Sequence, residues 1–432
     1  MVFDRKTYLD ELISNEGNGM IKIVTGIRRC GKSFLLFTLY KQNLLERGVP
    51  SDHIIEMNLE NRRNKKWRNP DNLLEYIDSK IPEEIRQISS TRETDALDEK
   101  YFVLLDEIQL VPEFEDVLNS YLSMSKVDVF VTGSNAKFLS KDVITEFRGR
   151  GWEIRVQPLS FKEYYEAKRG DKSERIAEYY RYGGLPGVAL LESPQEKEAY
   201  LKEVFDMVYL RDVVQRNHLK NADGLRELVR VLASAIGTST NVKRIVNTFK
   251  SEAGMNISPN TIAKYIEHLE DSFIISEALR YNVKGRKYIG TDTKYYFEDM
   301  GVRNAVLGFR QIEETHAMEN VLYNELRRKR YQVDVGQVDV WGKDAEGKTY
   351  KKQLEVDFVV NRASERIYIQ SVLAMPDREK EEQEQASLLN INDAFKKIII
   401  VGGYHIPHYN NDGVLITGLY DFLLDDSHLL TF

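Results

Sequence analysis

A short run of glycines, a lysine and a serine near the start of the chain has the spacing of a phosphate-binding loop. The run and the residue after it are Gly26, Ile27, Arg28, Arg29, Cys30, Gly31, Lys32, Ser33 and Phe34. An apolar, strand-like segment precedes it at residues 20–24, and a helix-like segment opens at its end. Glycines let backbone N–H groups turn toward phosphate oxygens, and a helix N-terminus adds partial positive charge. We expect Lys32 to contact the β- and γ-phosphates of ATP, and the Ser33 hydroxyl to be a ligand of Mg²⁺.

A second apolar run, at residues 101–105, ends in the two carboxylates that this chemistry requires. We expect Asp106 to hold the magnesium shell, and Glu107 to orient and deprotonate the attacking water. Taken alone, the pattern also fits a strand that ends in two solvated acids. The glycine loop upstream argues against that alternative.

Two further polar positions are candidates for a role near the γ-phosphate. A strand at residues 127–131 is followed by Asn135, which we expect to position water. Arg150 lies in a glycine-rich loop, from which it could reach the nucleotide of a neighbouring subunit and neutralise transition-state charge. An arginine that caps a helix or pairs within its own domain is the alternative, and both remain open. Cys30 has no expected catalytic role, but its place near a helix N-terminus predicts a reactive thiol.

Length and composition define the class of protein. At 432 residues the chain should form two to four domains, and 42% hydrophobic with 30% charged residues describes a globular protein. No apolar run is long enough for a membrane helix, and the charged start lacks a signal segment, so we expect a cytoplasmic protein without a membrane partner. One cysteine excludes an internal disulfide and a cysteine-based zinc site. The net charge of −7 argues against a globally basic nucleic-acid-binding protein but leaves local basic patches.

The middle of the chain predicts a helical lid and then a winged helix-turn-helix. Residues 164–219 have helical spacing. Helices at residues 225–235, 242–251 and 259–269 precede a hairpin at residues 274–281 and 288–297. The third helix carries carboxylates that would face phosphate, while the hairpin is basic. We favour a structural or protein-contacting role over DNA contact. The basic run at residues 61–68, with five cations around Trp67, is interpreted as a solvated loop in preference to a nucleic-acid grip.

The order of these motifs resembles the AAA+ ATPases, and more narrowly a prokaryotic family of them. The resemblance rests on the glycine loop, the acidic pair at Asp106, the Thr-Gly-Ser-Asn tip ending at Asn135, the loop of Arg150, and the segments 158–164 and 182–187. The Gly-Leu-Pro step also resembles the STAND-type ATPases, which implies that Pro186 packs on the adenine.

The last part of the chain resembles the PD-(D/E)XK nuclease fold. Its pattern predicts a helix with Glu319, strands with Asp357 and with Gln370, a helix at residues 378–389, and a strand at residues 397–401. That fold uses clustered carboxylates for a metal and a lysine for the attacking water. Here Tyr368 holds the expected acidic position and Gln370 the expected lysine position, so we expect a degenerate, inactive nuclease domain.

The sequence therefore predicts an α/β P-loop AAA+ core at residues 1–160 and a helical lid at 161–220. A winged helix-turn-helix at 221–298 and a restriction-endonuclease-like domain at 299–432 follow. The expected function is Mg²⁺-dependent ATP hydrolysis, with ADP as product, acting as a nucleotide-gated switch on a protein or DNA partner. A DNA-stimulated ATPase in defence, repair or mobile-element functions is the alternative. A homo-oligomer is expected only if Arg150 acts between subunits.

Overall fold

The computed structural model of the protein describes residues 2–87, 99–134, 147, 149–251, 254–310, 312–343 and 349–425. The chain divides into two compact units, which are described separately. Unit 1 comprises Met1–Pro158 and Asp271–Phe273, and unit 2 comprises Leu159–Glu270 and Ile274–Phe432. No helix within the described ranges is long and apolar enough to cross a lipid bilayer.

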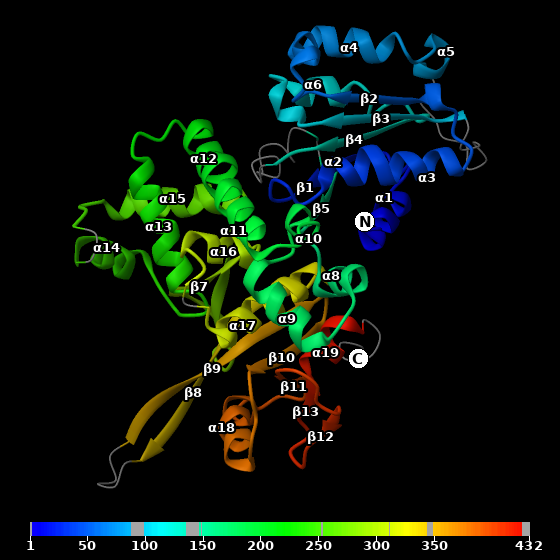
Figure 1. Cartoon of the computed structure of the whole chain (residues 1–432). Coiled ribbons are helices and arrows are strands. Elements are labelled where there is room, and N and C mark those ends of the chain that lie inside the picture. Colours follow the sequence, from blue (N-terminus) through cyan, green and yellow to red (C-terminus); the bar gives the residue numbers. More distant parts are fainter. Residues whose placement is uncertain are drawn as a thin grey trace. The chain divides into compact units, whose positions relative to one another are not determined.

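Unit 1 is built on a five-stranded sheet in which all pairs of neighbouring strands are parallel (Figure 1). In spatial order the strands are β2 (Ile54–Asn58), β3 (Tyr101–Asp106), β4 (Val127–Thr132), β1 (Ile21–Thr25) and β5 (Gly151–Arg155). Strand β4 lies between the strand that leads to the glycine loop and the strand that ends in the acidic pair. Since parallel strands end at the same edge, the loop after β1 and the acids after β3 share the carboxyl edge of the sheet.

Helices cover both faces of this sheet. They are α1 (Lys6–Ser14), α2 (Lys32–Phe34), α3 (Lys41–Glu46), α4 (Pro70–Asp78), α5 (Glu83–Arg86) and α6 (Phe114–Asn119), with a π-helical segment, Leu35–Tyr40, joining α2 to α3. One face buries Val103 and Val129 in a core with Leu73 of α4 and Leu118 of α6. On the other face the Tyr40 ring packs on Phe130, with centroids 4.7 Å apart. The inner strands β3, β4 and β1 are buried along their whole length, which is why their sequences are mostly apolar, whereas the edge strands β2 and β5 keep exposed residues.

Unit 2 begins with a group of helices. They are α8 (Phe161–Lys168), α9 (Lys172–Tyr182), α10 (Pro186–Ala189), α11 (Pro194–Glu203) and α12 (Arg211–Arg216), with a π-helical segment, Val204–Leu210, between the last two. Reciprocal capping boxes start two of them, with Ser160 and Glu163 at α8 and Ser193 and Glu196 at α11. Most of residues 164–219 is therefore helical.

Most of the next helices of unit 2 lie close to predicted positions, but those at residues 300–306 and 419–424 were not predicted. The helices are α13 (Ala222–Ser234), α14 (Val242–Ser251), α15 (Pro259–Asp271), α16 (Met300–Val306), α17 (Glu314–Arg328), α18 (Arg378–Leu389) and α19 (Leu419–Leu424). Asn304 of α16 donates hydrogen bonds of 2.8 and 2.9 Å to the carbonyls of Tyr180 and Arg181 in α9. Residues that the sequence assigned to a lid and to a C-terminal domain therefore pack together in one unit.

One eight-stranded sheet runs through unit 2, in the order β12-β13-β11-β10-β9-β8-β6-β7. The strands are β6 (Ile275–Asn282), β7 (Lys287–Phe297), β8 (Gln332–Lys343), β9 (Thr349–Arg362), β10 (Glu365–Val372), β11 (Lys396–Val401), β12 (His408–Tyr409) and β13 (Leu415–Gly418). The hairpin β6–β7, expected as a separate wing, pairs in parallel with β8. The predicted domain boundary between residues 298 and 299 thus remains a prediction, although strands on both sides of this boundary belong to the same sheet.

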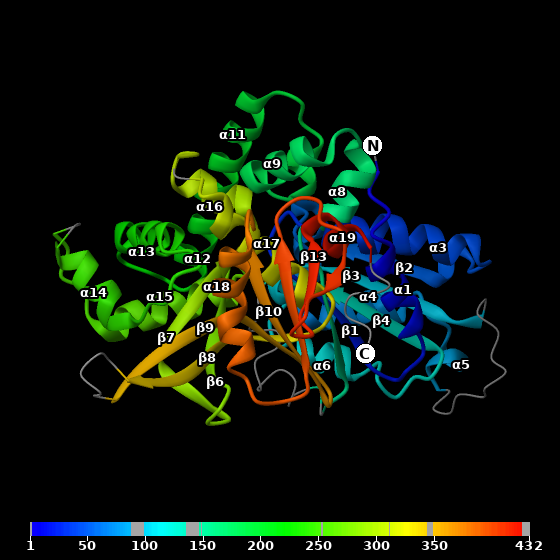
Figure 2. The same ribbon diagram turned by 90° about the horizontal axis from the view of Figure 1, so that it is seen from below.

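Helices α17 and α18 cover opposite faces of the strands β9 and β10. Phe358 and Val359 are neighbours in β9, so their side chains point to opposite faces. The Phe358 ring lies 6.5 Å from that of Tyr323 in α17, whereas Val359 belongs to a buried cluster with Leu388 of α18. Figure 2 shows α18 lying along β9 and β10, which it contacts.

Candidate nucleotide-binding site

The glycine loop has a backbone conformation that only glycine adopts easily. Gly26 has a φ of 135°, and a Cβ atom built on it would lie 2.0 Å from the Val156 carbonyl oxygen. Gly31, directly before α2, has a φ of 103°. Both values lie where side chains are strongly disfavoured, so the two glycines let this loop turn tightly between β1 and α2.

The side chain of Lys32 lies inside the loop. Its Nζ atom donates hydrogen bonds to the carbonyl oxygens of Gly26 at 2.8 Å and Ile27 at 3.1 Å, and the residue is 5% exposed. An ammonium group that is already desolvated and held by neutral carbonyls can exchange them for phosphate oxygens, which are stronger acceptors. The loop therefore fits a polyphosphate with its lysine in place.

Asp106 is the centre of a hydrogen-bond network at the carboxyl edge of the sheet. Its Oδ1 atom accepts from Ser33 Oγ at 2.9 Å and from Thr132 Oγ1 at 2.6 Å, and its Oδ2 atom accepts from Asn58 Nδ2 at 2.9 Å. Ser33, Asp106, Thr132 and Asn58 come from four segments that are far apart in the sequence. The expected pairing of Ser33 with Asp106 is thus present in the geometry.

Burial raises the pKa of Asp106 above its ordinary value, and the Glu107 carboxylate raises it further. The hydrogen bonds from Thr132 and Ser33 and the charge of Lys32 lower it. The hydrogen bonds and the lysine charge do not fully offset the desolvation of this carboxylate. A nearby cation would therefore stabilise its charged form. The Ser33 hydroxyl and the Asp106 carboxylate are hard oxygen ligands of the kind that Mg²⁺ uses beside phosphates, so the pair fits that ion.

Glu107 is held at the tip of β3 in a strained conformation. Its φ is 54°, a left-handed value that is uncommon for a residue with a side chain, and its N–H donates to Thr132 Oγ1 at 2.9 Å. The Glu107 carboxylate accepts hydrogen bonds from Ser134 Oγ at 3.1 Å and from the Gln109 side chain. These contacts fix a carboxylate beside Asp106, where a general base would be required.

Sequence reasoning missed the supporting residues of this edge. Thr132, Asn58 and Ser134 each lie at or just after the end of a parallel strand, and this position was the available signal. Asn135, which we expected to position water, lies outside the described residues. Ser134, directly before it, reaches the Glu107 carboxylate.

The remaining loop residues differ in their exposure. Phe34 is 40% exposed, Arg29 is exposed and Ile27 is buried. Cys30 is fully buried, and its thiol donates to the Val156 carbonyl oxygen at 3.2 Å. The prediction of a reactive thiol was therefore wrong, because the loop folds this side chain inward and away from solvent.

Arg150 lies at the opposite edge of the sheet from the glycine loop. It directly precedes β5, whose first residue pairs with Ile21 at the start of β1, whereas Gly26 follows the end of β1. Five strand residues at about 3.3 Å each span roughly 16 Å, which is beyond the reach of an arginine side chain. Arg150 therefore lies far from the glycine loop of its own chain.

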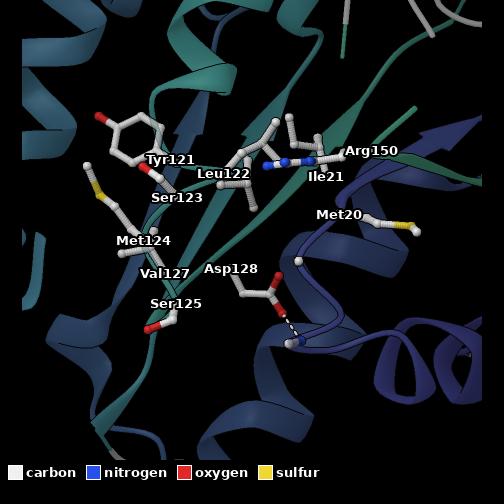
Figure 3. A pocket seen from close by; sticks show the side chains of 13 residues that line it. Met20, Ile21, Tyr121, Leu122, Ser123, Met124, Ser125, Val127, Asp128 and Arg150 are labelled. Carbon is white, nitrogen blue, oxygen red and sulfur yellow. Dashed lines mark hydrogen bonds between the residues drawn. The ribbon is translucent and has the colours of Figure 1, made fainter. Parts of the chain in front are cut away.

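A pocket of about 280 Å³ opens beside Arg150 at this amino edge (Figure 3). Its lining includes Met20, Tyr121, Met124 and Asp128. The Asp128 carboxylate already has partners within its own chain, because it forms an ion pair with the buried Lys22 and accepts a hydrogen bond of 2.8 Å from the Gly17 N–H. Among the described residues, no carboxylate forms an ion pair with Arg150, so pairing within its own domain gains no support from these parts of the chain.

Pro186 belongs to unit 2, where it is the first residue of α10. The segment before it is fixed by the buried carboxylate of Asp299, which accepts from the Gly184 N–H at 2.7 Å and from the Val302 N–H at 3.0 Å. A Cβ atom on Gly183, whose φ is 72°, would lie 2.2 Å from that carboxylate. Burial raises the pKa of Asp299 to about 6, while the backbone N–H groups lower it.

The two positions that were expected to carry nuclease groups do not face Asp357. Tyr368 is buried in the cluster under α18 and donates to Asp393 at 2.7 Å, and Gln370 accepts from Ser387 of α18 at 3.5 Å. Asp357 instead interacts electrostatically with Glu319 of α17, on the other face. Ile369, which pairs with Phe358, lies on the α17 face. Neither Ile369 nor Ser371 supplies an acid or a lysine.

Comparison with known proteins gives the class of the N-terminal part. Residues 18–165 match the family model described as an AAA domain, and residues 173–313 match that of a domain of unknown function, DUF8612. The parallel sheet, the glycine loop and the acidic pair lie within the first match. This part of the chain is therefore an AAA domain with a P-loop core, a class that binds nucleotides and has ATPase activity in general.

Sequence relatives define the family. An uncharacterized protein of Haemophilus influenzae is 32% identical over 428 residues, which cover 98% of this chain and 99% of that protein. The chain belongs to the same family as this Haemophilus protein. An uncharacterized protein of Methanocaldococcus jannaschii is 28% identical over 323 residues, covering 72% of this chain and 67% of that protein.

A solved structure with partial similarity is that of the Aeropyrum pernix Orc1 protein in complex with DNA. It is 14% identical, covers 71% of this chain and 92% of its own, and has a TM-score of 0.28. With a TM-score this low, no conclusion about this chain rests on it.

Proposed function

We propose that this chain binds ATP at the glycine loop and hydrolyses it with Mg²⁺. The observation that carries the proposal is the 2.9 Å hydrogen bond between Ser33 Oγ and Asp106 Oδ1, with Lys32 buried in the adjacent loop. Ser33 and Asp106 would hold Mg²⁺, which would supply positive charge against the charge that develops on the phosphates. ATP hydrolysis by the purified chain, measured as released phosphate with and without Mg²⁺, tests this proposal.

The residues of the site have separable roles in this proposal. Lys32 exchanges its bonds to the loop carbonyls for bonds to phosphate oxygens. Glu107 orients the attacking water and accepts its proton, and Ser134 and Gln109 keep the carboxylate in position. Asn135 stays a predicted water-positioning residue.

We further propose that Arg150 acts on the nucleotide of a neighbouring copy. Its place at the opposite sheet edge prevents action on its own loop, and the pocket beside it leaves room for part of a second chain. A cation placed from outside can neutralise transition-state charge without changing the ground-state affinity for ATP. This proposal implies an oligomer in which each site takes one arginine from its neighbour.

The segment at Pro186 supports the proposal that this ATPase acts as a nucleotide-gated switch. Pro186 follows the Gly183–Gly184 step, which the buried Asp299 ties to α16. If Pro186 contacts the adenine, a nucleotide would bias the position of α16 through this carboxylate. ATP-dependent and ADP-dependent changes in proteolysis of unit 2 would measure that coupling.

Stimulation by DNA remains the alternative. The observation that favours it is the turn of the β6–β7 hairpin, where Lys284, Arg286 and Lys287 are all exposed. Trp67 of the other basic run packs instead against Tyr76, with ring centroids 4.7 Å apart, which limits base stacking there. ATP turnover measured with duplex DNA over a salt series distinguishes a DNA-stimulated ATPase from a switch that does not need DNA. Stimulation through phosphate contacts should weaken steeply as the salt concentration rises.

A further inference from the structure

Three acidic side chains of unit 2 gather around one buried lysine on the α17 face of the sheet. Lys294 of β7 has its Nζ atom 2.8 Å from Glu319 Oε1 of α17 and 2.7 Å from Glu355 Oε1 of β9. Lys294 is 3% exposed. The Tyr296 hydroxyl donates to the same Glu319 oxygen at 2.6 Å. The ammonium group therefore bridges two carboxylates from elements that are distant in sequence.

The third acid, Asp357, adds no full charge to this cluster at neutral pH. Burial and the nearby Glu319 carboxylate raise the pKa of Asp357 to about 8, while Lys294 and the Ser371 N–H lower it. The Ser371 N–H donates to Asp357 Oδ2 at 2.8 Å. The Glu319 and Glu355 carboxylates thus share one ammonium group.

Other basic side chains surround the cluster at longer range. Arg280 of β6 lies 3.8 Å from Glu355 Oε2 and 3.6 Å from Asp292, and His316 of α17 lies 3.9 Å from Glu319 Oε2. The Glu319 carboxylate raises the pKa of His316. The charge of Glu319 and Glu355 is therefore balanced by groups of this chain alone.

A lysine ammonium and a divalent cation compete for the same oxygens. Mg²⁺ and Ca²⁺ hold carboxylate oxygens at about 2.0–2.6 Å, and a lysine at hydrogen-bond distance occupies that space and cancels the attraction. Accordingly, within the ranges that the structure describes, no three His, Cys, Asp or Glu side chains are arranged to hold a metal ion.

We propose that the Lys294 ammonium occupies the cation position of the Glu319–Glu355–Asp357 cluster, so that unit 2 takes no divalent cation there. Lys294 binds as an internal ligand and ties the β6–β7 hairpin to α17 and β9. Any contact of this surface with nucleic acid is consequently binding without metal-assisted cleavage at these carboxylates. The inference does not depend on the proposed ATP site, which belongs to unit 1.

Manganese binding to the full-length, nucleotide-free chain tests the proposal, with bound Mn²⁺ measured by electron paramagnetic resonance. We expect wild type and Glu319→Gln to bind Mn²⁺ equally, because the ion does not enter the cluster. Lys294→Ala should gain one bound Mn²⁺ with at least a tenfold higher affinity than wild type. The double variant Lys294→Ala, Glu319→Gln should lose it. Lys287→Ala, an exposed lysine on the same strand, is the matched control and should behave as wild type.

Two results would overturn the proposal. One is an Mn²⁺ ion that wild type binds and Glu319→Gln loses, since the cluster would then hold a metal despite the lysine. The other is a folded Lys294→Ala chain that gains no Mn²⁺. If Lys294→Ala does not fold, the comparison of wild type with Glu319→Gln decides alone, with equal binding supporting the proposal.

Discussion

The Ser33 hydroxyl donates a hydrogen bond of 2.9 Å to Asp106 Oδ1, joining the first turn after the glycine loop to the tip of β3. The two residues are separated by a complete crossover and by strand β4 in the sheet. Their contact makes a continuous polar edge from the loop to Glu107.

Replacing Lys32 by alanine should weaken ATP binding. A hydrogen bond between charged groups contributes roughly 1.5–3 kcal/mol, so we expect a loss of about 10- to 150-fold in affinity. Isothermal titration calorimetry with Mg·ATP measures this. Lys41→Ala, which removes a half-buried lysine that pairs with Glu56 further along the same helical segment, is the control and should bind normally. Equal affinities for both variants would show that Lys32 does not contact phosphate.

Replacing Glu107 by glutamine should leave ATP binding intact and slow turnover. General-base catalysis contributes about 10²- to 10⁴-fold, and the amide keeps the shape of the side chain but cannot accept the proton. Single-turnover phosphate release, together with a binding titration, separates the two effects. Glu75→Gln, on the exposed side of α4, should retain wild-type turnover. A Glu107→Gln chain with unchanged turnover would contradict the assigned role.

Arg150→Ala should abolish turnover while ATP affinity stays near normal, because the proposed role of the arginine is to neutralise transition-state charge at a neighbouring site. The ATP turnover of a mixture of two variants tests this role more sharply. Arg150→Ala chains keep an intact loop, and Glu107→Gln chains keep the arginine, so the mixture should recover part of the activity that each lacks. Arg378→Ala, at an exposed arginine of α18, is the control. Failure of the mixture to recover any activity would argue for a structural arginine.

Asp299 should make stability depend on pH. Its folded-state pKa of about 6 lies above the ordinary 3.8, so proton binding stabilises the folded chain at low pH. This contribution is fully present below pH 3.8 and is lost as pH rises through 6. The shift corresponds to roughly 3 kcal/mol. In urea unfolding, the stability of wild type relative to Asp299→Asn should therefore rise as pH falls from 7 to 4. The same comparison with the exposed Asp10→Asn should give no such slope in that window.

Alkylation of Cys30 should be slow in the native chain. The thiol is fully buried and bonded to the Val156 carbonyl oxygen, so it reacts only when the loop opens. Iodoacetamide labelling, followed by mass spectrometry, should be at least tenfold slower than in urea. A chain with Cys30→Ser and Thr38→Cys, which moves the cysteine to an exposed position of the next helical segment, should label rapidly. Fast native labelling of Cys30 would show that the loop opens easily.

Much of the nucleotide site could be predicted because its parts are local in the sequence. The residues from Gly26 to Ser33 are contiguous, and their backbone conformation follows from the two glycines. The acids Asp106 and Glu107 directly end an apolar run. Thr132 and Asn58 escaped prediction because their roles come from the order of strands in the sheet, which the residue pattern does not contain.

The C-terminal half shows where pattern reasoning fails. The positions of most of its helices and strands followed from periodicity, but the face of the sheet on which Tyr368 and Gln370 lie did not. The bulge in the β8–β9 pairing, between Asp334 and Gly336, changes which residues of β9 share a face, and a shift of one residue reverses the direction of every side chain. Lys294, on a strand assigned to another domain, could not be connected with Glu319 from the sequence.

By itself, the sequence determined the glycine loop, its lysine and serine, and the acidic pair, because local spacing fixes backbone conformation and chemistry together. Tertiary structure alone decided that Arg150 faces away from its own loop and that Cys30 is sealed from solvent. It also placed a lysine among the carboxylates of unit 2. These facts depend on strand order, register and packing between distant segments, which arise only when the whole chain buries its apolar surface.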